Sequence, residues 1–251
     1  MTYYLLHLDE SHSDQTRIWS LCGVCVPIDK YDEVRCAFYD VIRFLIQPDS
    51  TTIETSPPEL HGAYFLRDVH GVDDQRRIEV ARDVADLVVQ QRLPVLRYGR
   101  RYQAGDKPDS GTLKIGTWGG LRLRLMERAQ DEKFIPIMDG FDGETVREMS
   151  GLVRGMDVLH AAGAGDPTDH GFRQIIGEVF YSDSRYSIMG QVADMVGYLR
   201  HVTDKQSAGL SLSGFARDLA AISSRLDSAI SVEIIDDIRS SATTLNGRGD
   251  R

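Results

Sequence analysis

Three aspartates far apart in the sequence stand where carboxylates can hold metal ions. Asp9 ends the apolar run "TYYLLHLD", Asp139 ends the apolar run "KFIPIMD", and Asp194 lies within "SIMGQVADMVGYLRHVT". The two runs predict strands, and the third segment predicts a helix with Asp194 at the border of its apolar stripe. Carboxylates at two strand ends and on one packed helix can converge at the edge of a sheet. Such a cluster would need a cation, and Mg²⁺ prefers oxygen ligands of this kind.

Each of these acids also has a simpler interpretation. A strand end is often solvated, a helix border can carry a surface charge, and a carboxylate that is buried can be matched by Arg or Lys instead of a metal. The residues alone leave these alternatives open.

Other polar groups near the three aspartates extend the candidate set. Glu10 follows Asp9, and if the strand continues through it, the two side chains point to opposite faces. Glu10 is then either a group that supports the ligands or a ligand of a second metal. His7 shares the face of Asp9 and fits a core histidine or a group that orients ligands. Gln191 is expected to orient a carboxylate by hydrogen bonding.

The segment "PELHG" places Glu59 and His61 on one side if it is extended. This pair fits a metal ligand next to a histidine that handles protons or contacts phosphate. A loop acid beside a surface histidine is the alternative.

Four segments together resemble a known family. "YYLLHLDES", "PELHG", "IPIMDG" and "GQVADMVGYL" occur in this order between Tyr3 and Leu199. The ordered set is similar to the motifs of the bacterial domain-of-unknown-function family numbered 3800, which is regarded as RNase H-like. In that fold, acids on the first strand, a central strand and a C-terminal helix bind two metal ions. The resemblance implies metal ligation by Asp9, Asp139 and Asp194, with Glu59 or Glu10 as a further acid.

This resemblance makes two-metal phosphodiester cleavage with Mg²⁺ or Mn²⁺ the leading hypothesis. Asp9 would bridge the ions, and Asp139 and Asp194 would hold one ion each. Nucleic acid is the expected partner, and two arginine-rich stretches could contact its backbone. They contain Arg97, Arg100 and Arg101 ("RYGRR") and Arg122, Arg124 and Arg128 ("RLRLMER"). Solvated surface charge is the alternative for these arginines.

Two rival functions stay open. One is a non-catalytic RNase H-like module that binds nucleic acid or protein in a defence or mobile-element setting. The other is a metal-dependent phosphoesterase that acts on small phosphates. The sequence contains no Walker loop, Rossmann glycine pattern or nucleophile elbow, so it gives no support to ATPase, dehydrogenase or serine-hydrolase activity.

Composition limits the protein class. The chain has 251 residues, is 41% hydrophobic and carries a net charge of −9, which argues against a general nucleic-acid coat protein. It contains no apolar run near the ~20 residues of a membrane span and no signal peptide, so we expect a cytoplasmic protein. Cys22 and Cys25 form a CxxC inside an expected strand, where they would point to opposite faces as buried thiols.

The order of elements predicts an α/β fold: an RNase H-like mixed sheet that opens with an antiparallel hairpin and carries helices on both faces. We expect an RNase H-like domain over residues 1–205, a C-terminal helical extension over 206–240, and a disordered tail over 241–251. An amphipathic helix that starts near Ser213 could pack on the core or form a homodimer; the sequence does not decide which.

Overall fold

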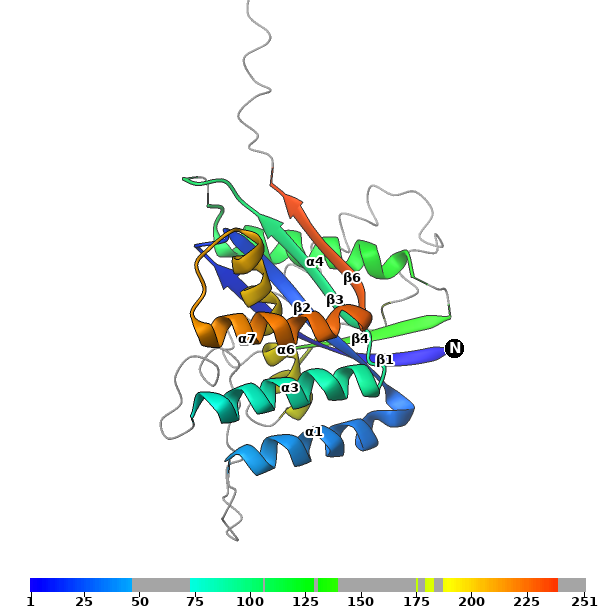
Figure 1. The fold of residues 1–251 in the computed structure, drawn as a ribbon. Coiled ribbons are helices and arrows are strands. Elements are labelled where there is room, and N and C mark those ends of the chain that lie inside the picture. The colour runs from blue at the N-terminus through cyan, green and yellow to red at the C-terminus, as the bar shows by residue number, and fades with distance from the viewer. Residues whose placement is uncertain are drawn as a thin grey trace, which may run out of the picture.

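The computed structural model describes residues 1–46, 73–105, 107–128, 131–139, 175, 179–182 and 187–238. Within this part of the chain, six strands form one mixed sheet in the order β5-β4-β1-β2-β3-β6 (Figure 1). The strands are β1 (Thr2–Ser13), β2 (Ile18–Pro27), β3 (Val95–Arg101), β4 (Glu132–Asp139), β5 (Phe180–Ser182) and β6 (Ile230–Asp237).

The directions of the strands follow from their connections. β1 and β2 form the expected antiparallel hairpin, and β3 is antiparallel to β2. β4 is parallel to β1, β5 is parallel to β4, and β6 is parallel to β3. The prediction of an α/β fold with a mixed sheet that opens with a hairpin is confirmed.

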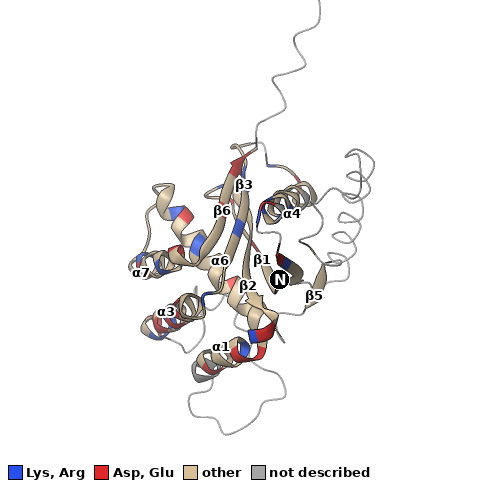
Figure 2. Cartoon of the chain, turned by 90° about the vertical axis from the view of Figure 1, so that its right-hand side faces the viewer, with Lys and Arg blue, Asp and Glu red and all other residues tan. Residues whose placement is uncertain are grey.

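Helices cover both faces of this sheet. They are α1 (Tyr31–Ile46), α3 (Asp74–Gln90), α4 (Ser110–Met126), α6 (Ile188–Ser207) and α7 (Gly214–Ser223), with short 3-10 helices η1 (Ile28–Lys30) and η4 (Ser224–Ser228). Figure 2 shows α4 on one side of the sheet and α1, α3 and α7 on the other. α6 packs on β1 and β2 and also contacts α1, α3 and α7, so it lies on the side opposite α4. None of the helices in the described ranges is long and apolar enough to cross a membrane.

Side-chain caps define where four of these helices begin, and Ser187 caps α6 by accepting a hydrogen bond from the backbone N–H of Gly190 at 3.1 Å. Asp73 accepts a hydrogen bond from the backbone N–H of Arg76 at 2.7 Å, and Asp109 accepts one from Thr112 at 2.9 Å. Ser213 does the same at the start of α7. These bonds satisfy N–H groups that have no partner within the helix, which is why short polar residues stand at these positions.

The two faces of the sheet pack into separate hydrophobic cores. Cys22 lies in the core under α6, and Cys25 lies in the core under α4. Both thiols are free and fully buried, whereas Cys36 on α1 is exposed. The prediction that the CxxC pair consists of buried thiols on opposite faces is therefore confirmed, because residues three apart on a strand point to opposite sides.

A glycine lets α4 approach the sheet closely. A Cβ atom at Gly120 would lie 2.1 Å from the ring of Tyr98 on β3, a distance that no side chain tolerates. Gly120 costs helix propensity at this position, but it allows the large Tyr98 side chain to fill the space between β3 and the helix. This contact explains a glycine that local helix propensity disfavours.

The C-terminal region differs from the prediction. Residues Ile230–Asp237 form β6, which extends the sheet by pairing with β3, so 206–240 is not a separate helical extension. The helix near Ser213 is present as α7, and it packs on α3 and α6 of the same chain. Its buried residues include Leu219 and Ile222. The tail expected over 241–251 lies outside the described residues.

Candidate functional site

Asp9 begins a row of residues that crosses the sheet on the face covered by α6. In the strand register, Asp9 is the partner of Cys22, Cys22 of Arg97, and Arg97 of Glu233. Register partners on neighbouring strands project to the same face, and Cys22 is buried in the core under α6. The row therefore brings one acid from β1, one cation from β3 and one acid from β6 to a single face.

The parallel pairing of β1 and β4 brings the backbone of Asp139 next to that of Asp9. Their register runs from Thr2↔Glu132 to Leu8↔Met138, and the next residue on each strand is an aspartate. Neighbouring strands lie about 4.8 Å apart. The two predicted strand-end acids thus occupy equivalent positions on adjacent strands. The side chain of Asp139 lies outside the described part of the structure.

Helix α6 carries Asp194 across the same face. Gly197 lies over β2, where an added Cβ would be 3.4 Å from the Cβ of Cys22. Further along α6, Arg200 and Asp204 reach residues of β6 and β3. α6 also packs on β1, and the half-buried Asp194 lies one turn before Gly197 on the same side of the helix.

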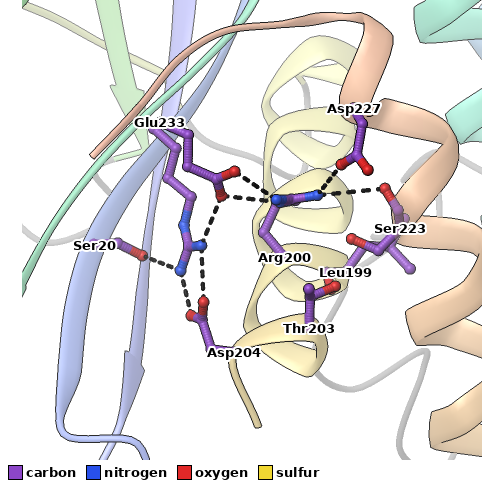
Figure 3. Close-up of polar contacts among 9 residues, drawn as sticks. Ser20, Leu199, Arg200, Thr203, Asp204, Ser223, Asp227 and Glu233 are labelled. Atoms are coloured by element: carbon purple, nitrogen blue, oxygen red, sulfur yellow. Dashed lines mark hydrogen bonds and ion pairs between the residues drawn. The ribbon is translucent and has the colours of Figure 1, made fainter. Parts of the chain in front are cut away.

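A network of two arginines and three carboxylates occupies the other end of the row (Figure 3). We call it the arginine cluster, and it consists of Arg97, Arg200, Asp204, Asp227 and Glu233. The Nη1 atom of Arg97 donates to Asp204 and to Glu233, both at 3.0 Å. Arg200 donates to both oxygens of Glu233 and, at 2.8 Å, to Asp227. The cluster thereby connects β3, α6, η4 and β6.

Arg97 is deep inside this cluster, with only 2% of its surface exposed. Burial lowers the pKa of the guanidinium, but its hydrogen bonds to Asp204 and the negative charge of Asp204 outweigh this effect, so the pKa is raised. The guanidinium remains charged and is neutralised within the protein. The expectation that Arg97 contacts nucleic acid is therefore wrong, because the group is used inside the fold.

Three other arginines of the two basic stretches also have acidic neighbours. Arg101 stays on the surface, 3.6 Å from Asp237. Arg124 forms an ion pair with Glu127 at 2.7 Å, and Arg128 forms one with Glu132 at 2.6 Å. Figure 2 shows basic and acidic residues interspersed along the helices. The stretches thus provide less uncompensated positive charge than their composition indicates.

Glu10 lies on the face of the sheet opposite Asp9. β1 continues to Ser13, and Glu10 pairs in register with Leu21, which belongs to the core under α4. Lys114 of α4 forms an ion pair with Glu10 at 3.2 Å. Glu10 therefore projects away from Asp9, towards α4, and its role as a supporting group or as a ligand of a second metal stays a prediction.

His7 shares the face of Asp9 and is 2% exposed. Desolvation lowers its pKa to about 4, so the imidazole is neutral at pH 7. Its ring stacks on Tyr31 with a centroid distance of 5.9 Å, and among the described residues neither ring nitrogen has a hydrogen-bond partner. Gln191, one turn before Asp194 on α6, is also buried.

The described residues supply part of the predicted ligand set. Asp9 and Asp194 bring two carboxylates to one face of the sheet. Burial raises the pKa of Cys22 to about 12, Arg97 and Arg200 lower it, and the charge of Asp9 adds to the increase. Cys22 is thus a protonated thiol in the same row as Asp9.

Two other members of the predicted set are Glu59 and His61, which lie outside the described residues. Among the side chains that the structure describes, no group of three His, Cys, Asp or Glu could hold a metal ion. Carboxylate oxygens of Asp9 and Asp194 fit Mg²⁺ or Mn²⁺, which typically take only one or two carboxylates with water and phosphate.

Residues of the arginine cluster were not among the predicted site residues, Arg97 excepted. The sequence does contain one signal for β6: "ISVEII" alternates apolar and polar residues with β-branched side chains, which is typical of a strand. Nothing local to Asp204 or Glu233 indicates that Arg97, more than 100 residues earlier, is the partner of both.

No family model matches this sequence, and comparisons with curated proteins and with solved structures also found no match.

Proposed function

We propose that this chain is a divalent-metal-dependent nuclease with an RNase H-like sheet, which cleaves phosphodiester bonds with two Mg²⁺ or Mn²⁺ ions. One observation carries the proposal. Asp9 and Asp139 follow the last registered pair of two adjacent parallel strands, and α6, which carries Asp194, packs on β1. This strand pairing and helix packing support a common site for acids from the first strand, its parallel neighbour and a late helix, as the sequence resemblance implies.

The roles of the residues follow from their positions. Asp9 lies on β1, between β4 and β2. It would hold the metal ions together with Asp139 and Asp194. When bound, two divalent ions would activate a water molecule and stabilise the leaving oxygen. Gln191 lies one helical turn before Asp194 and is placed to hold that carboxylate in orientation. Arg101, exposed at the end of β3, is the arginine of this strand that remains accessible to a phosphate.

The ion pairs of the arginines favour a second candidate, a phosphoesterase for small phosphate esters. A polynucleotide is held mainly by Lys and Arg side chains that neutralise successive phosphates. Here Arg97 is buried, and Arg124 and Arg128 already have carboxylate partners. A small substrate needs fewer such contacts than a polynucleotide.

Cleavage assays with a matched pair of variants test these proposals. Purified protein is incubated with single- and double-stranded DNA and RNA, and with bis-p-nitrophenyl phosphate, in Mn²⁺, in Mg²⁺ and in EDTA. We expect metal-dependent cleavage, which Asp194→Asn abolishes without loss of fold. Asp218→Asn, an exposed acid on α7, is the control and should retain activity. Cleavage of the small ester but of no polynucleotide would support the phosphoesterase instead.

Calorimetric titration with Mn²⁺ separates both enzymes from a non-catalytic binding module. A module has no need for divalent ions, whereas the proposed site requires them. Absence of Mn²⁺ binding to the wild-type protein, or full activity of Asp194→Asn, would rule out the two-metal mechanism.

A further inference from the structure

Three contacts attach the same side of α6 to the sheet. Gly197 lies against Cys22 of β2, Arg200 binds Glu233 of β6, and Asp204 binds Arg97 of β3. These helix positions are separated by three and four residues, so they form one line along α6. Asp194 precedes Gly197 by three residues and continues this line towards β1.

The arginine cluster joins α6 and the sheet through reciprocal charges. The sheet contributes a cation, Arg97, which binds an anion of the helix, Asp204. The sheet also contributes an anion, Glu233, which binds a cation of the helix, Arg200. Arg97 additionally binds Glu233, so the two pairs are connected. Turning α6 by one residue, or sliding it by one turn, would separate both pairs and leave charges buried without partners, which is strongly unfavourable.

We infer that the arginine cluster is a positioning device: it fixes the rotation and height of α6 on β2, and thereby places Asp194 relative to Asp9. The metal-binding part of this inference rests on the proposed function, whereas the placement of α6 does not. Gly197 completes the device, since its missing side chain lets the helix lie directly on Cys22. Arg97 thus acts on the site through α6 and not through contact with a substrate.

The native cysteines report on the position of α6. Cys22 is buried beneath Gly197, Cys25 is buried on the opposite face, and Cys36 is exposed. Modification by N-ethylmaleimide, followed by peptide mass spectrometry, measures the three thiols separately in the whole chain. In the wild-type protein we expect rapid modification of Cys36 and strong protection of the other two.

The test variant removes one reciprocal pair without leaving a lone charge: Arg97→Met combined with Asp204→Leu. Replacement of both partners of a buried pair by apolar residues is often tolerated. We expect at least tenfold faster modification of Cys22 with no change at Cys25, and a Mn²⁺ Kd at least tenfold higher. Gly197→Leu is a second variant, which should produce the same pattern because its side chain forces α6 away from β2.

The matched control is Arg225→Met combined with Asp86→Leu. This exposed ion pair, at 2.5 Å, connects η4 to α3 and does not involve α6, so Cys22 protection and Mn²⁺ affinity should stay at wild-type values. The inference is overturned if Cys22 stays protected in both test variants. It is also overturned if Cys22 and Cys25 become reactive together, which would show general loss of stability.

The same experiment distinguishes failure of this inference from failure of the proposed function. If the wild-type protein does not bind Mn²⁺, the nuclease proposal is lost, and selective exposure of Cys22 still establishes that the cluster positions α6. If Mn²⁺ binds to the double variant with wild-type affinity, the cluster does not position Asp194 for the metal.

Discussion

Arg200 holds Glu233 through two parallel hydrogen bonds, from Nε to Oε1 at 3.1 Å and from Nη2 to Oε2 at 2.5 Å. This two-point geometry matches the planar guanidinium to the carboxylate and fixes both orientation and distance. Because Glu233 also accepts a hydrogen bond from Arg97, one carboxylate of β6 connects the two cations of the arginine cluster. Its loss should therefore affect more than a single pair.

Replacement of Glu233 by Gln should lower the free energy of unfolding by about 3 kcal/mol, since it leaves two largely buried guanidiniums with fewer anionic partners. Urea denaturation at pH 7 measures this change. Glu127→Gln is the control: its partner Arg124 is also an arginine, but the pair is exposed at the surface, and the loss of stability should be much smaller than for Glu233→Gln. Equal losses in the two variants would contradict the central place of Glu233.

Two adjacent acids should behave differently when each is replaced by its amide. Asp9→Asn removes a proposed metal ligand and should abolish Mn²⁺-dependent cleavage with the fold retained. Glu10→Gln affects the opposite face, where it weakens the ion pair with Lys114, and should keep most of the activity. Cleavage rates and circular dichroism of both variants check this difference. If the Glu10→Gln variant were folded but inactive, the active site would have to include residues from both faces of the sheet.

The folded protein should become less stable as the pH decreases, because of His7. The folded-state pKa is lowered to about 4 from 6.5, so between these values the unfolded chain binds a proton that the folded chain excludes. Folding is therefore favoured above pH 6.5, and the contribution is lost as pH decreases towards 4, by about 1.4 kcal/mol per pH unit. Urea denaturation between pH 4 and 7 measures the slope. His7→Gln should reduce the slope of the unfolding free energy against pH by the equivalent of about one bound proton. An unchanged slope would show that other groups cause the pH dependence.

Two glycine substitutions should have opposite effects on stability. Gly120→Ala puts a methyl group into the ring of Tyr98 and should destabilise the protein by about 1–3 kcal/mol through overpacking. Gly214→Ala, at the start of α7, meets no atom within 4 Å and should stabilise it by up to about 1 kcal/mol. Thermal denaturation of both variants gives the comparison. A stabilising Gly120→Ala would show that α4 lies farther from β3.

The type of most described elements could be predicted from the sequence, because each depends on a local pattern. Alternating apolar residues and a short polar turn predict the β1–β2 hairpin, and periodic apolar residues predict α3, α6 and α7. Strand periodicity also suffices to place Cys22 and Cys25 on opposite faces. For the same reason, Asp9 and Glu10 could be assigned to opposite faces once the strand was known to continue beyond them.

Contacts between segments that are distant in the sequence could be identified only from the tertiary structure. Arg97 and Arg101 look alike in "RYGRR", yet the first is buried against Asp204 and Glu233 and the second is at the surface. Local sequence patterns do not determine the order of strands in a sheet. They could therefore not indicate that β6 would pair with β3 or that Glu233 would face Arg97. Periodicity determines the face on which a side chain projects, whereas the partners that it meets there are determined by long-range register and helix packing.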